Sequence, residues 1–489
     1  MTAPTLRCAV RTDLPVPEWQ ARCVDLLAAV PGVVLVGPDD SAAATVDVVL
    51  DLTAGTPPPV QRAAETWSFR HGAGASRDFD RTALEDYVRG PGVTRTALVS
   101  DPSGAIVREG WPRSAVWSRR PALEARLIEL AEWPAYAARD RLAGRTSPPV
   151  AGADDRRARG DPVPALVRGR LGAVPRPILV LGAAARRVEE VAVSLTRHPD
   201  WNVGIMPEPI DGMVRSRGGR TIEWLPARPD AWVADPFGIE RGGVLHLFFE
   251  DFSRNLNRGV ISYASVSRDG IVSAPECVLD VGVHASYPFL IERDGTVFIL
   301  PETSAAGELV LYEAVEFPRR WRRAATLLPG VPAVDASVVE HEGRWWMFAG
   351  IFGRGQNHTL FAWHAPDLMG PWTEHAANPV KTDARSTRGG GTPFVVDGTL
   401  YRPSQDCSRT YGGRLVLNRV ELLSPSAFRE RPIRALAPRA GSPYPEGLHT
   451  LSAAGTRTLV DGYGRRFVRE DMQRLLEYKQ RQVMAKLGF

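Results

Sequence analysis

Pro288–Leu300, PFLIERDGTVFIL, predicts a β-hairpin: an apolar strand, a tight turn that ends at Gly295, and a second apolar strand. Four further stretches share this design, namely PFGIERGGVLHLF from Pro236, SVVEHEGRWWMF from Ser337, PFVVDGTLYRP from Pro393 and TLSAAGTRTLV from Thr450. The turn glycines, at positions 243, 295, 343, 398 and 455, are 52, 48, 55 and 57 residues apart. The chain therefore repeats one hairpin at a nearly constant interval.

The interval predicts a β-propeller. Units of about 50 residues, each with four short strands, are typical of propeller blades, and five such units predict a five-bladed propeller over residues 201–465. The alternative is a β-sandwich, which has no reason to return to one hairpin at this interval. Residues 466–489 are charged with an apolar helical face, so we expect a helix packed on the outside.

Residues 1–145 have a different pattern. Apolar runs at 7–10, 33–37, 46–52 and 94–99 alternate with helix-like segments, the last at 121–142, which predicts a Rossmann-like α/β domain. Residues 146–200 begin as a polar, Pro- and Gly-rich linker, and we expect a bridging strand at 178–181 and a helix at 187–197 after it. The predicted fold is thus an α/β N-terminal domain followed by an all-β propeller.

Composition narrows the class of partner. The 489 residues carry 60 basic and 56 acidic groups spread along the whole chain, which is not a polyanion-binding surface and argues against nucleic acid. No apolar run reaches the ~18–20 residues of a membrane span, and the first strand-like stretch lacks a signal-peptide core, so we expect a cytoplasmic protein. The four cysteines have no zinc or redox spacing and are expected to be structural thiols.

The repeat also predicts a site. The innermost strand of each propeller blade lines the axis, so polar residues at the same place in successive repeats converge there. The residues at this place are Asp235, Tyr287, Asp335, Thr392 and His449. Two carboxylates that face one cavity are what glycosidic chemistry requires. The alternative is that both aspartates only cap turns.

The propeller stretches resemble a known family. WVADPFGIERGGVLHLFFE from Trp232, YPFLIERDGTVFILPETS from Tyr287 and RPSQDC from Arg402 are similar to bacterial relatives of the propeller-containing part of glucosamine inositolphosphorylceramide transferases. That propeller is in turn similar to glycoside hydrolase family 43. The resemblance implies that Asp235 is a general base and that Asp335 orients and tunes the acid. In the plant transferases sugar transfer is attributed to a separate exostosin-like domain, for which we find no room here.

The general acid is the point where the resemblance fails. Family 43 places a glutamate in the fourth repeat, where this chain has Gly389–Gly391 followed by Thr392. Glu302, Glu446 and Asp406 are the candidate replacements, and each could equally be a structural ion-paired group. The sequence thus predicts a carbohydrate-active enzyme, in polysaccharide or glycosylated natural-product metabolism, that cleaves or transfers a glycosyl unit. The alternative is a non-catalytic glycan- or nucleotide-sugar-binding module.

Other residues are expected to contact the ligand. Arg388 and Arg402 flank the glycine run and suit an anionic group, or else form ion pairs with neighbouring loops. Trp232 lies beside the predicted site and could stack on a sugar ring. His449 could hold a central cation, as a histidine does in several family 43 propellers, or could be a hydrogen-bonded core residue. We expect no other cofactor and no catalytic metal.

The N-terminal region resembles a formyltransferase-like domain through VDVVLDLTAG from Val46 and TWSFRHGAG from Thr66. Active formyltransferases carry an Asn-x-His pair with a downstream aspartate, whereas this chain reads Ser68-Phe69-Arg70-His71. We therefore expect a domain that has kept the scaffold and lost that reaction. Formyl transfer with another base near His71 is the alternative.

Overall fold

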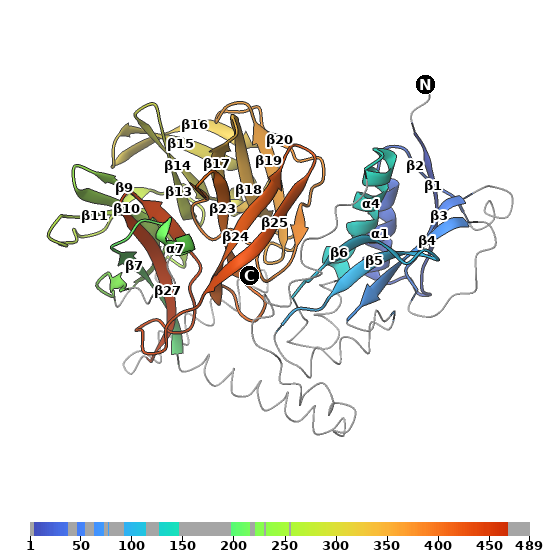
Figure 1. Cartoon of the computed structure of the whole chain (residues 1–489), viewed down its shortest axis with the longest axis horizontal. Helices are drawn as coiled ribbons and strands as arrows, with labels where there is room; N and C mark the ends of the chain where they lie inside the picture. The colour runs from blue at the N-terminus through green and yellow to red at the C-terminus, as the bar shows by residue number, and fades with distance from the viewer. Residues whose placement is uncertain are drawn as a thin grey trace, which may run out of the picture.

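The computed structural model describes residues 4–37, 46–53, 63–72, 77, 92–113, 127–145, 197–215, 221–228, 231–253 and 256–467. The expected linker, the strand at 178–181, the helix at 187–197 and the helix at 466–489 lie outside these residues, except for their ends. Arg197 begins a strand and Phe467 ends one. Within the described residues a mixed sheet is followed by a ring of five sheets, so the predicted five-bladed propeller is confirmed (Figure 1).

The N-terminal sheet has six strands in the order β2-β1-β3-β4-β5-β6. These are β2 (Val33–Leu35), β1 (Leu6–Arg11), β3 (Val46–Asp51), β4 (Ala63–His71), β5 (Thr96–Asp101) and β6 (Ala105–Gly110). The first four are parallel, and β5 and β6 are antiparallel to their neighbours. Helices α1 (Glu18–Ala28) and α4 (Trp133–Leu142) pack on it through one apolar cluster. The sequence analysis did not anticipate β4 and β6 as strands.

Each blade is an antiparallel meander of four strands, to which blade 3 adds a fifth short strand. Blade 1 contains β9 (Ala231–Arg241), β10 (Val244–Ser253), β11 (Arg258–Val266) and β12 (Glu276–Leu279). Blade 2 contains β13 (Ser286–Arg293), β14 (Thr296–Glu302), β15 (Leu309–Glu316) and β16 (Arg320–Leu328), with the 3-10 helix η2 (Ser304–Ala306). Blade 3 contains β17 (Ala333–His341), β18 (Arg344–Ile351), β19 (Thr359–Ala365), β20 (Thr373–Glu374) and the short β21 (Lys381–Thr382), which also pairs with β19.

Blade 4 contains β22 (Phe394–Val396), β23 (Thr399–Asp406), β24 (Arg414–Leu423) and β25 (Phe428–Leu436). Blade 5 joins the two ends of the propeller. It contains β26 (Leu451–Ala454), β27 (Arg457–Phe467), β7 (Arg197–Met206) and β8 (Glu223–Trp224), with the short helix α7 (Gly212–Arg215) between β7 and β8. Strand β7, the first of the propeller, pairs with β27, the last. The pairing runs from Met206 opposite Thr458 to Arg197 opposite Phe467, and it closes the ring.

The repeated turns follow from backbone geometry. In blades 1 to 4 both central residues of the first hairpin have positive φ, for example 50° at Asp294 and 77° at Gly295. Two-residue hairpins with this twist favour Asp-Gly or Gly-Gly, because glycine adopts positive φ without steric cost. The glycine that repeats in the sequence is thus the residue that lets each inner strand reverse.

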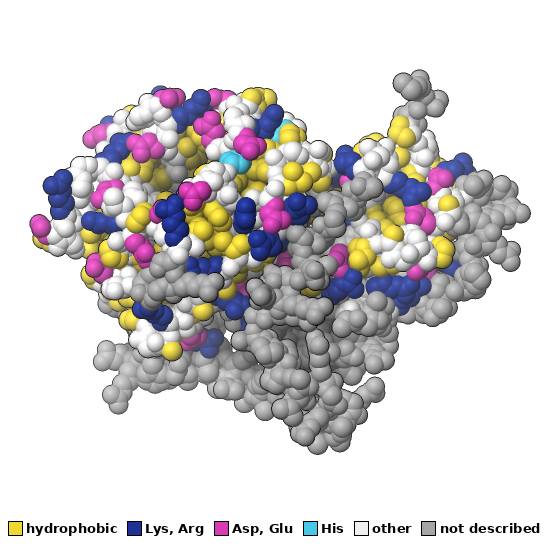
Figure 2. Space-filling view, in the orientation of Figure 1, with side chains coloured by type: hydrophobic (Ala, Val, Ile, Leu, Met, Phe, Trp, Pro, Cys, Tyr) yellow, Lys and Arg dark blue, Asp and Glu magenta, His cyan; other side chains and the backbone are white. Residues whose placement is uncertain are grey.

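Two interfaces hold the molecule together. The seam between blades 5 and 1 buries Val203, Leu245, Phe249 and Leu459 in one cluster. The N-terminal domain contacts the propeller through ion pairs such as Glu132–Arg354 and through a backbone bridge at Trp111. On the visible face, basic and acidic side chains are intermixed over the propeller (Figure 2). Among the described residues, no helix combines the length and apolarity needed to cross a bilayer.

The apolar cluster between blades 5 and 1 predicts a large effect of mutation on stability. Leu459 is fully buried in this cluster, so Leu459→Ala should lower the free energy of unfolding by about 2–5 kcal/mol. Leu422→Ala on β24 is the control, because Leu422 is 42% exposed and its loss should change stability by about 0.5 kcal/mol or less. Urea unfolding followed by tryptophan fluorescence measures both. Equal midpoints for the two variants would contradict the assigned seam.

Candidate active site at the propeller axis

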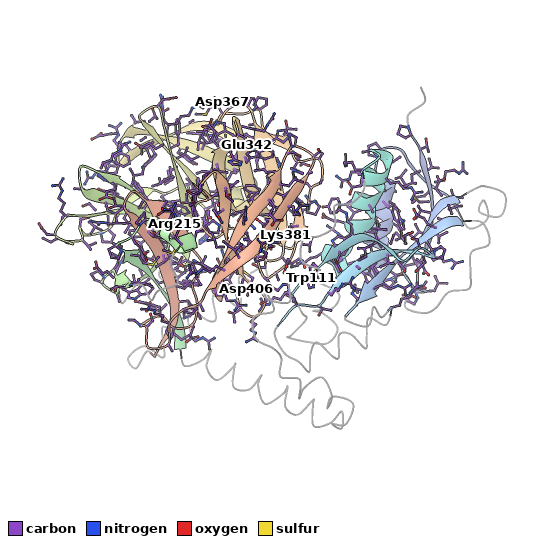
Figure 3. All side chains as sticks on the ribbon, in the orientation of Figure 1. Trp111, Arg215, Glu342, Asp367, Lys381 and Asp406 are labelled. Carbon is purple, nitrogen blue, oxygen red and sulfur yellow. The ribbon has the colours of Figure 1, made fainter. Side chains whose placement is uncertain are left out.

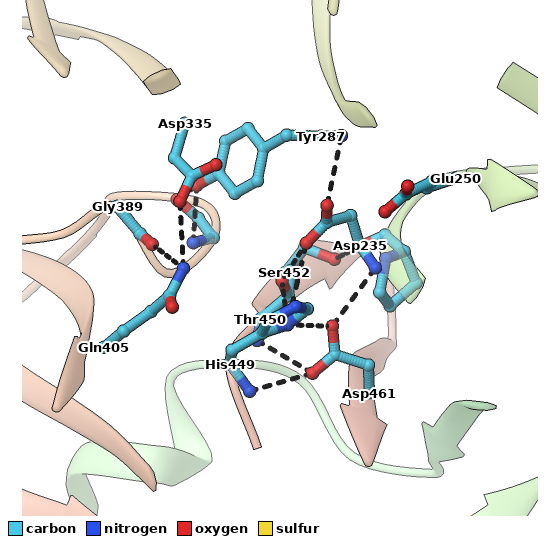
Figure 4. Close-up of polar contacts among 12 residues, drawn as sticks. Asp235, Glu250, Tyr287, Asp335, Gly389, Gln405, His449, Thr450, Ser452 and Asp461 are labelled. Carbon is cyan, nitrogen blue, oxygen red and sulfur yellow. Dashed lines mark hydrogen bonds and ion pairs between the residues drawn. The ribbon is translucent and has the colours of Figure 1, made fainter. Parts of the chain in front are cut away.

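Three residues at the axis share an uncommon backbone conformation. Asp235, Tyr287 and Asp335 have φ of 51°, 46° and 49°, and each lies at a register shift between the first two strands of its blade. Each amide donates to a carboxylate of the preceding blade: Asp235 N to Asp461 Oδ2 (3.1 Å), Tyr287 N to Asp235 Oδ2 (3.2 Å) and Asp335 N to Glu302 Oε2 (3.0 Å). Buried amides need such partners, so these bonds help to hold the left-handed backbone. Figure 4 shows the first two of them, Asp235 with Asp461 and Tyr287 with Asp235.

Asp235 is the centre of the contacts on the side of blades 1 and 5. Its Oδ1 accepts a hydrogen bond from the Thr450 hydroxyl (2.8 Å), and His449 Nδ1 lies 3.6 Å from the same oxygen. Burial raises the pKa of Asp235 to about 6, although the nearby His449 opposes this shift. Asp235 is therefore largely ionised at pH 7, with a proton affinity that suits a general base.

His449 is held in place from three sides. Its ring stacks on Trp201 with centroids 3.9 Å apart, Tyr411 meets it edge-on, and Nδ1 contacts Asp461 Oδ2. Burial alone would lower the pKa of His449, but the Asp461 and Asp235 carboxylates raise it. For Asp461, burial would raise the pKa, but His449 lowers it. The two side chains thus form a buried ion pair.

The same residues are the candidate cation site. One ligand atom each from Asp235, His449 and Asp461 lies within 4.8 Å of the others. Two carboxylates and an imidazole suit a divalent cation. These groups also satisfy one another, since His449 contacts both carboxylates and Thr450 donates to Asp235. The donor set fits a cation, and the local hydrogen bonds give the site a stable arrangement without it.

Glu302 and Asp335 form a second pair, between blades 2 and 3. Besides the Asp335 amide, Glu302 accepts the Ser304 hydroxyl at Oε1 (3.1 Å). Asp335 Oδ2 accepts both Arg388 Nε (2.7 Å) and Gln405 Nε2 (2.9 Å). Burial, together with the Asp335 carboxylate, raises the pKa of Glu302 to about 8. Glu302 is therefore mostly protonated at pH 7 and has the proton that a general acid needs.

Glu250 is a further buried carboxyl group at the axis. It comes from β10 and lies beside Asp235 in Figure 4. Its Oε1 accepts no hydrogen bond from the described residues, and His284 Nε2 is 3.5 Å away. Burial, followed by the charges of Asp235 and Glu302, raises its pKa well above the ordinary value. Glu250 thus joins Glu302 as a carboxyl group that favours the protonated form.

Tyr287 fills the space between these pairs. Its hydroxyl contacts Ser337 Oγ (2.8 Å) and accepts the amide of Gly391 (2.6 Å), which links blades 2, 3 and 4. This packing requires glycine at two positions of the run. A side-chain carbon on Gly390 would lie 2.8 Å from the Ser404 backbone, and Gly391 has φ 120°. Thr392 pairs its amide with Leu451 O (3.0 Å). The glycines therefore permit close approach between blades.

Arg388 is brought to the axis as the sequence predicted, but as the partner of Asp335. Its Nη1 also donates to Asn357 Oδ1 (2.9 Å), and its guanidinium lies over the Tyr411 ring. Burial would lower the pKa of Arg388, but Asp335 and other neighbours raise it well above its ordinary value. The Arg388 guanidinium, itself bonded to Asn357, therefore orients the Asp335 carboxylate.

Four other predicted residues have structural partners instead. Arg402 is 1% exposed and bound to Glu430 inside blade 4, so it is not available to a ligand. Asp406 pairs with Arg414, and Glu446 pairs with Arg465 at the edge of blade 5. Trp232 stacks on Phe252 with centroids 4.6 Å apart, which occupies one ring face. The ion pairs of Arg402, Asp406 and Glu446 match the structural alternative that the sequence left open for these three residues.

Sequence reasoning missed several residues of the cluster, mainly Glu250, Gln405, Thr450 and Asp461. A readable signal exists for two of them. The residue seven positions after the turn glycine is Glu250, Glu302, Gly350 and Gln405 in blades 1 to 4. The second strand of each hairpin returns toward the axis at that distance from its turn. Asp461 lies six positions after Gly455 and does not follow the same count.

Two other places in the described residues contain none or few of the axial groups. A groove of about 580 Å³ lies along the seam of blades 4 and 5 and is lined by residues such as Met206, Trp224 and Leu436, none of them a predicted site residue. In the N-terminal domain, His71 is buried at the end of β4 with Nδ1 3.0 Å from Thr96 Oγ1. Asp51 is paired with Arg77. This geometry does not by itself reveal formyltransferase chemistry.

The propeller region is similar in sequence to one described family of proteins. Residues 225–440 match the family described as the N-terminal part of glucosamine inositolphosphorylceramide transferase 1. Proteins of that name from Oryza sativa subsp. japonica and Arabidopsis thaliana are each 36% identical to this chain, over 211 and 208 residues. The matches cover 42% and 41% of this chain but only 28% and 27% of those proteins. The chain therefore matches less than a third of the length of these relatives.

Solved structures with a similar propeller include glycoside hydrolases. A thermostable family 43 glycoside hydrolase is 15% identical with a TM-score of 0.38, covering 50% of this chain and 90% of the other. An exo-β-1,3-galactanase from Clostridium thermocellum is 14% identical with a TM-score of 0.35, covering 43% and 53%. At these TM-scores the similarities add no weight to the geometry described above.

The raised pKa of Glu302 predicts a pH-dependent stability. The native state keeps the Glu302 proton up to about pH 8, whereas the unfolded chain releases it near 4.5, so wild-type stability falls as the pH rises between these values. Glu302→Gln removes this loss. The variant should gain stability relative to wild type by up to about 1.4 kcal/mol per pH unit in that window, measured by urea unfolding at several pH values.

Glu446→Gln is the matched control for this experiment. It loses only the Arg465 ion pair at the edge of blade 5 and should keep a constant offset from wild type. If the Glu302→Gln offset is also constant from pH 5 to 8, Glu302 does not titrate with a raised pKa and its assignment as an acid is wrong.

Proposed function

We propose that this chain is a carbohydrate-active enzyme that cleaves or transfers a glycosyl unit at the propeller axis. One observation carries the proposal: the carboxyl groups of Asp235 and Glu302, on adjacent blades, are buried at the axis, and each accepts the amide of the next blade's inner strand. Burial raises the pKa of both groups, to about 6 for Asp235 and to about 8 for Glu302. Carboxyl groups whose environments push their pKa values apart are the usual pair of base and acid in such chemistry.

The roles follow from the protonation states at neutral pH. Asp235, ionised, removes the proton of a water or an acceptor hydroxyl as its oxygen bonds to the sugar carbon. Glu302, protonated, gives its proton to the leaving oxygen as the glycosidic bond breaks. Asp335 acts through Glu302, because its amide binds Glu302 Oε2 while Arg388 and Gln405 hold its carboxylate.

The substrate class is proposed from the relatives. The matched plant proteins are named for glucosamine and for inositolphosphorylceramide, so the first glycans to test contain an amino sugar or an inositol linked to phosphate. Arg388 is the cationic group of the axial cluster that suits an anionic substituent, provided that substrate displaces part of its contact with Asp335.

A non-catalytic glycan- or nucleotide-sugar-binding module is the second candidate, and two features favour it. The Tyr287 hydroxyl bonds to Ser337 and Gly391 between the two carboxyl pairs, and the fourth repeat has Gly389–Gly391 followed by Thr392 where the resemblance to family 43 would place the acid. A binding module needs no proton donor at the axis. Binding of the same glycans without turnover, measured by calorimetry, would favour this candidate over catalysis.

Catalysis by this pair predicts a bell-shaped pH profile. The value of kcat/KM should rise through about pH 6, as Asp235 ionises, and fall through about pH 8, as Glu302 loses its proton. Asp235→Asn should remove the acidic limb, Glu302→Gln the basic limb, and each should reduce kcat by about 10²–10⁴-fold. The assay follows released or transferred sugar by mass spectrometry.

Asp406→Asn and Glu446→Gln are the control variants, because both residues carry the same chemistry in ion pairs away from the cluster. They should retain wild-type kcat. The mechanism is excluded if Asp235→Asn and Asp335→Asn both turn over the true substrate at the wild-type rate.

A further inference from the structure

The segment 383–391, here named the axial strap, connects β21 to β22 and lies between the two domains. Its far end carries the groups that complete the axial cluster. Arg388 binds Asp335, the Gly389 carbonyl accepts Gln405 Nε2 (2.7 Å), and the Gly391 amide binds the Tyr287 hydroxyl. The position of the strap therefore sets the position of the axial guanidinium.

The N-terminal domain holds the outer side of the strap. Immediately after β6, the Trp111 amide donates to Thr382 O (2.9 Å) and its carbonyl accepts the Ala384 amide (3.0 Å). The Arg385 guanidinium lies 5.0 Å from the centre of the Trp111 ring. Figure 3 shows Trp111 at the junction of the domains, close to Lys381. Trp111 thus pairs in parallel with Asp383, directly after β21, as a residue of a neighbouring strand would.

The propeller holds the inner side of the strap. Strand β23 and its extension pair with the strap through Gln405 N to Arg388 O (2.9 Å) and Cys407 N to Ala384 O (2.8 Å). Beneath it, Arg402 Nη2 donates to Ser386 O (2.8 Å) in the buried cluster with Glu430. Ala384 is therefore bonded on one side to Trp111 and on the other to Cys407.

A second contact reaches the strap by another route. Glu129 of the N-terminal domain pairs with His358 Nε2 (3.1 Å), and the His358 carbonyl accepts the Asp383 amide (2.7 Å). A third interdomain contact, Glu132 with Arg354, involves no strap residue. Arg113 Nη2 also donates to Arg409 O (2.7 Å), which lies outside the strap. The contacts of the N-terminal domain thus reach the strap directly through Trp111 and, by way of His358, at Asp383.

We propose that the N-terminal domain is a positioning domain: its Trp111 backbone clamps the axial strap, so that Arg388 and Gly391 reach Asp335 and Tyr287. This role does not depend on whether the axial cluster catalyses or only binds. Three kinds of contact restrict the strap: backbone pairing on its two faces, the side-chain bonds of Arg388 and Arg402, and close packing of its three glycines. Trp111 supplies the backbone pairing that comes from the N-terminal domain.

Gly110 offers a direct test in the full chain. A side-chain carbon at this position would lie 2.8 Å from Thr382 Cβ and Cγ2, so Gly110→Val should push β21 and the strap away from Trp111. Hydrogen–deuterium exchange measured by mass spectrometry should then show about ten-fold faster exchange in peptides covering 383–391 and in the Leu451 amide, which bonds to Gly390 O. Peptides from β10 and β14 should exchange as in wild type.

Glu132→Gln is the matched control, because it weakens a domain contact without touching the strap. Its strap peptides should keep wild-type exchange. Gly110→Ala, measured alongside, places only the first side-chain carbon against Thr382 and should give a smaller increase in the same peptides. This second variant decides the outcome if Gly110→Val does not fold.

The proposal is overturned by either of two results. One is unchanged exchange at 385–391 and at Leu451 in both Gly110 variants. The other is an equal increase in Glu132→Gln, which would show that domain attachment in general, and not the Trp111 clamp, protects the strap. Neither readout uses turnover, so failure here is distinguishable from failure of the proposed catalytic function.

Discussion

The structure depends on hydrogen bonds that pass from blade to blade around the axis. The amides of Asp235, Tyr287 and Asp335 lie in left-handed backbone and each donates to a carboxylate of the blade before it. Without those acceptors a buried amide would be unpaired in a conformation that is already unfavourable for a residue with a side chain. The buried carboxylates of the axial cluster are therefore also the groups that bond one blade to the next.

The axial carboxylates accept backbone amides, but burying a carboxyl group costs free energy when it ionises, and an uncharged acceptor would avoid that cost. Asp461 pairs with His449 and favours its ionised form, which is what a structural acceptor needs. Glu302 and Glu250 are instead buried with raised pKa values, so their ionisation destabilises the native state as the pH rises. An amide side chain would accept the Asp335 amide without that cost. Retaining acids there is consistent with a role in proton transfer.

Much of the ring was predictable because strand period and turn chemistry are local. The spacing of the hairpins predicted the blades, and their register placed Asp235, Tyr287 and Asp335 together at the axis. The sequence left open whether Arg402 binds a ligand or forms an ion pair, because its partner Glu430 is 28 residues away on β25, a distance at which pairing leaves no readable pattern. Gln405 and Glu250 were missed because attention to the first strand of each hairpin overlooked the second.

The repeat, the turn glycines and the residues that face the axis can be read from the amino-acid sequence, since all three arise from the two-residue period of a strand and the positive φ of a tight turn. The folded ring is needed to show which acids meet, which guanidinium reaches Asp335, and that Trp111 of the N-terminal domain lies against the axial strap. Those contacts join residues far apart in the chain. The pKa values of the axial carboxyl groups are raised by burial, and these groups become buried only when the ring is closed.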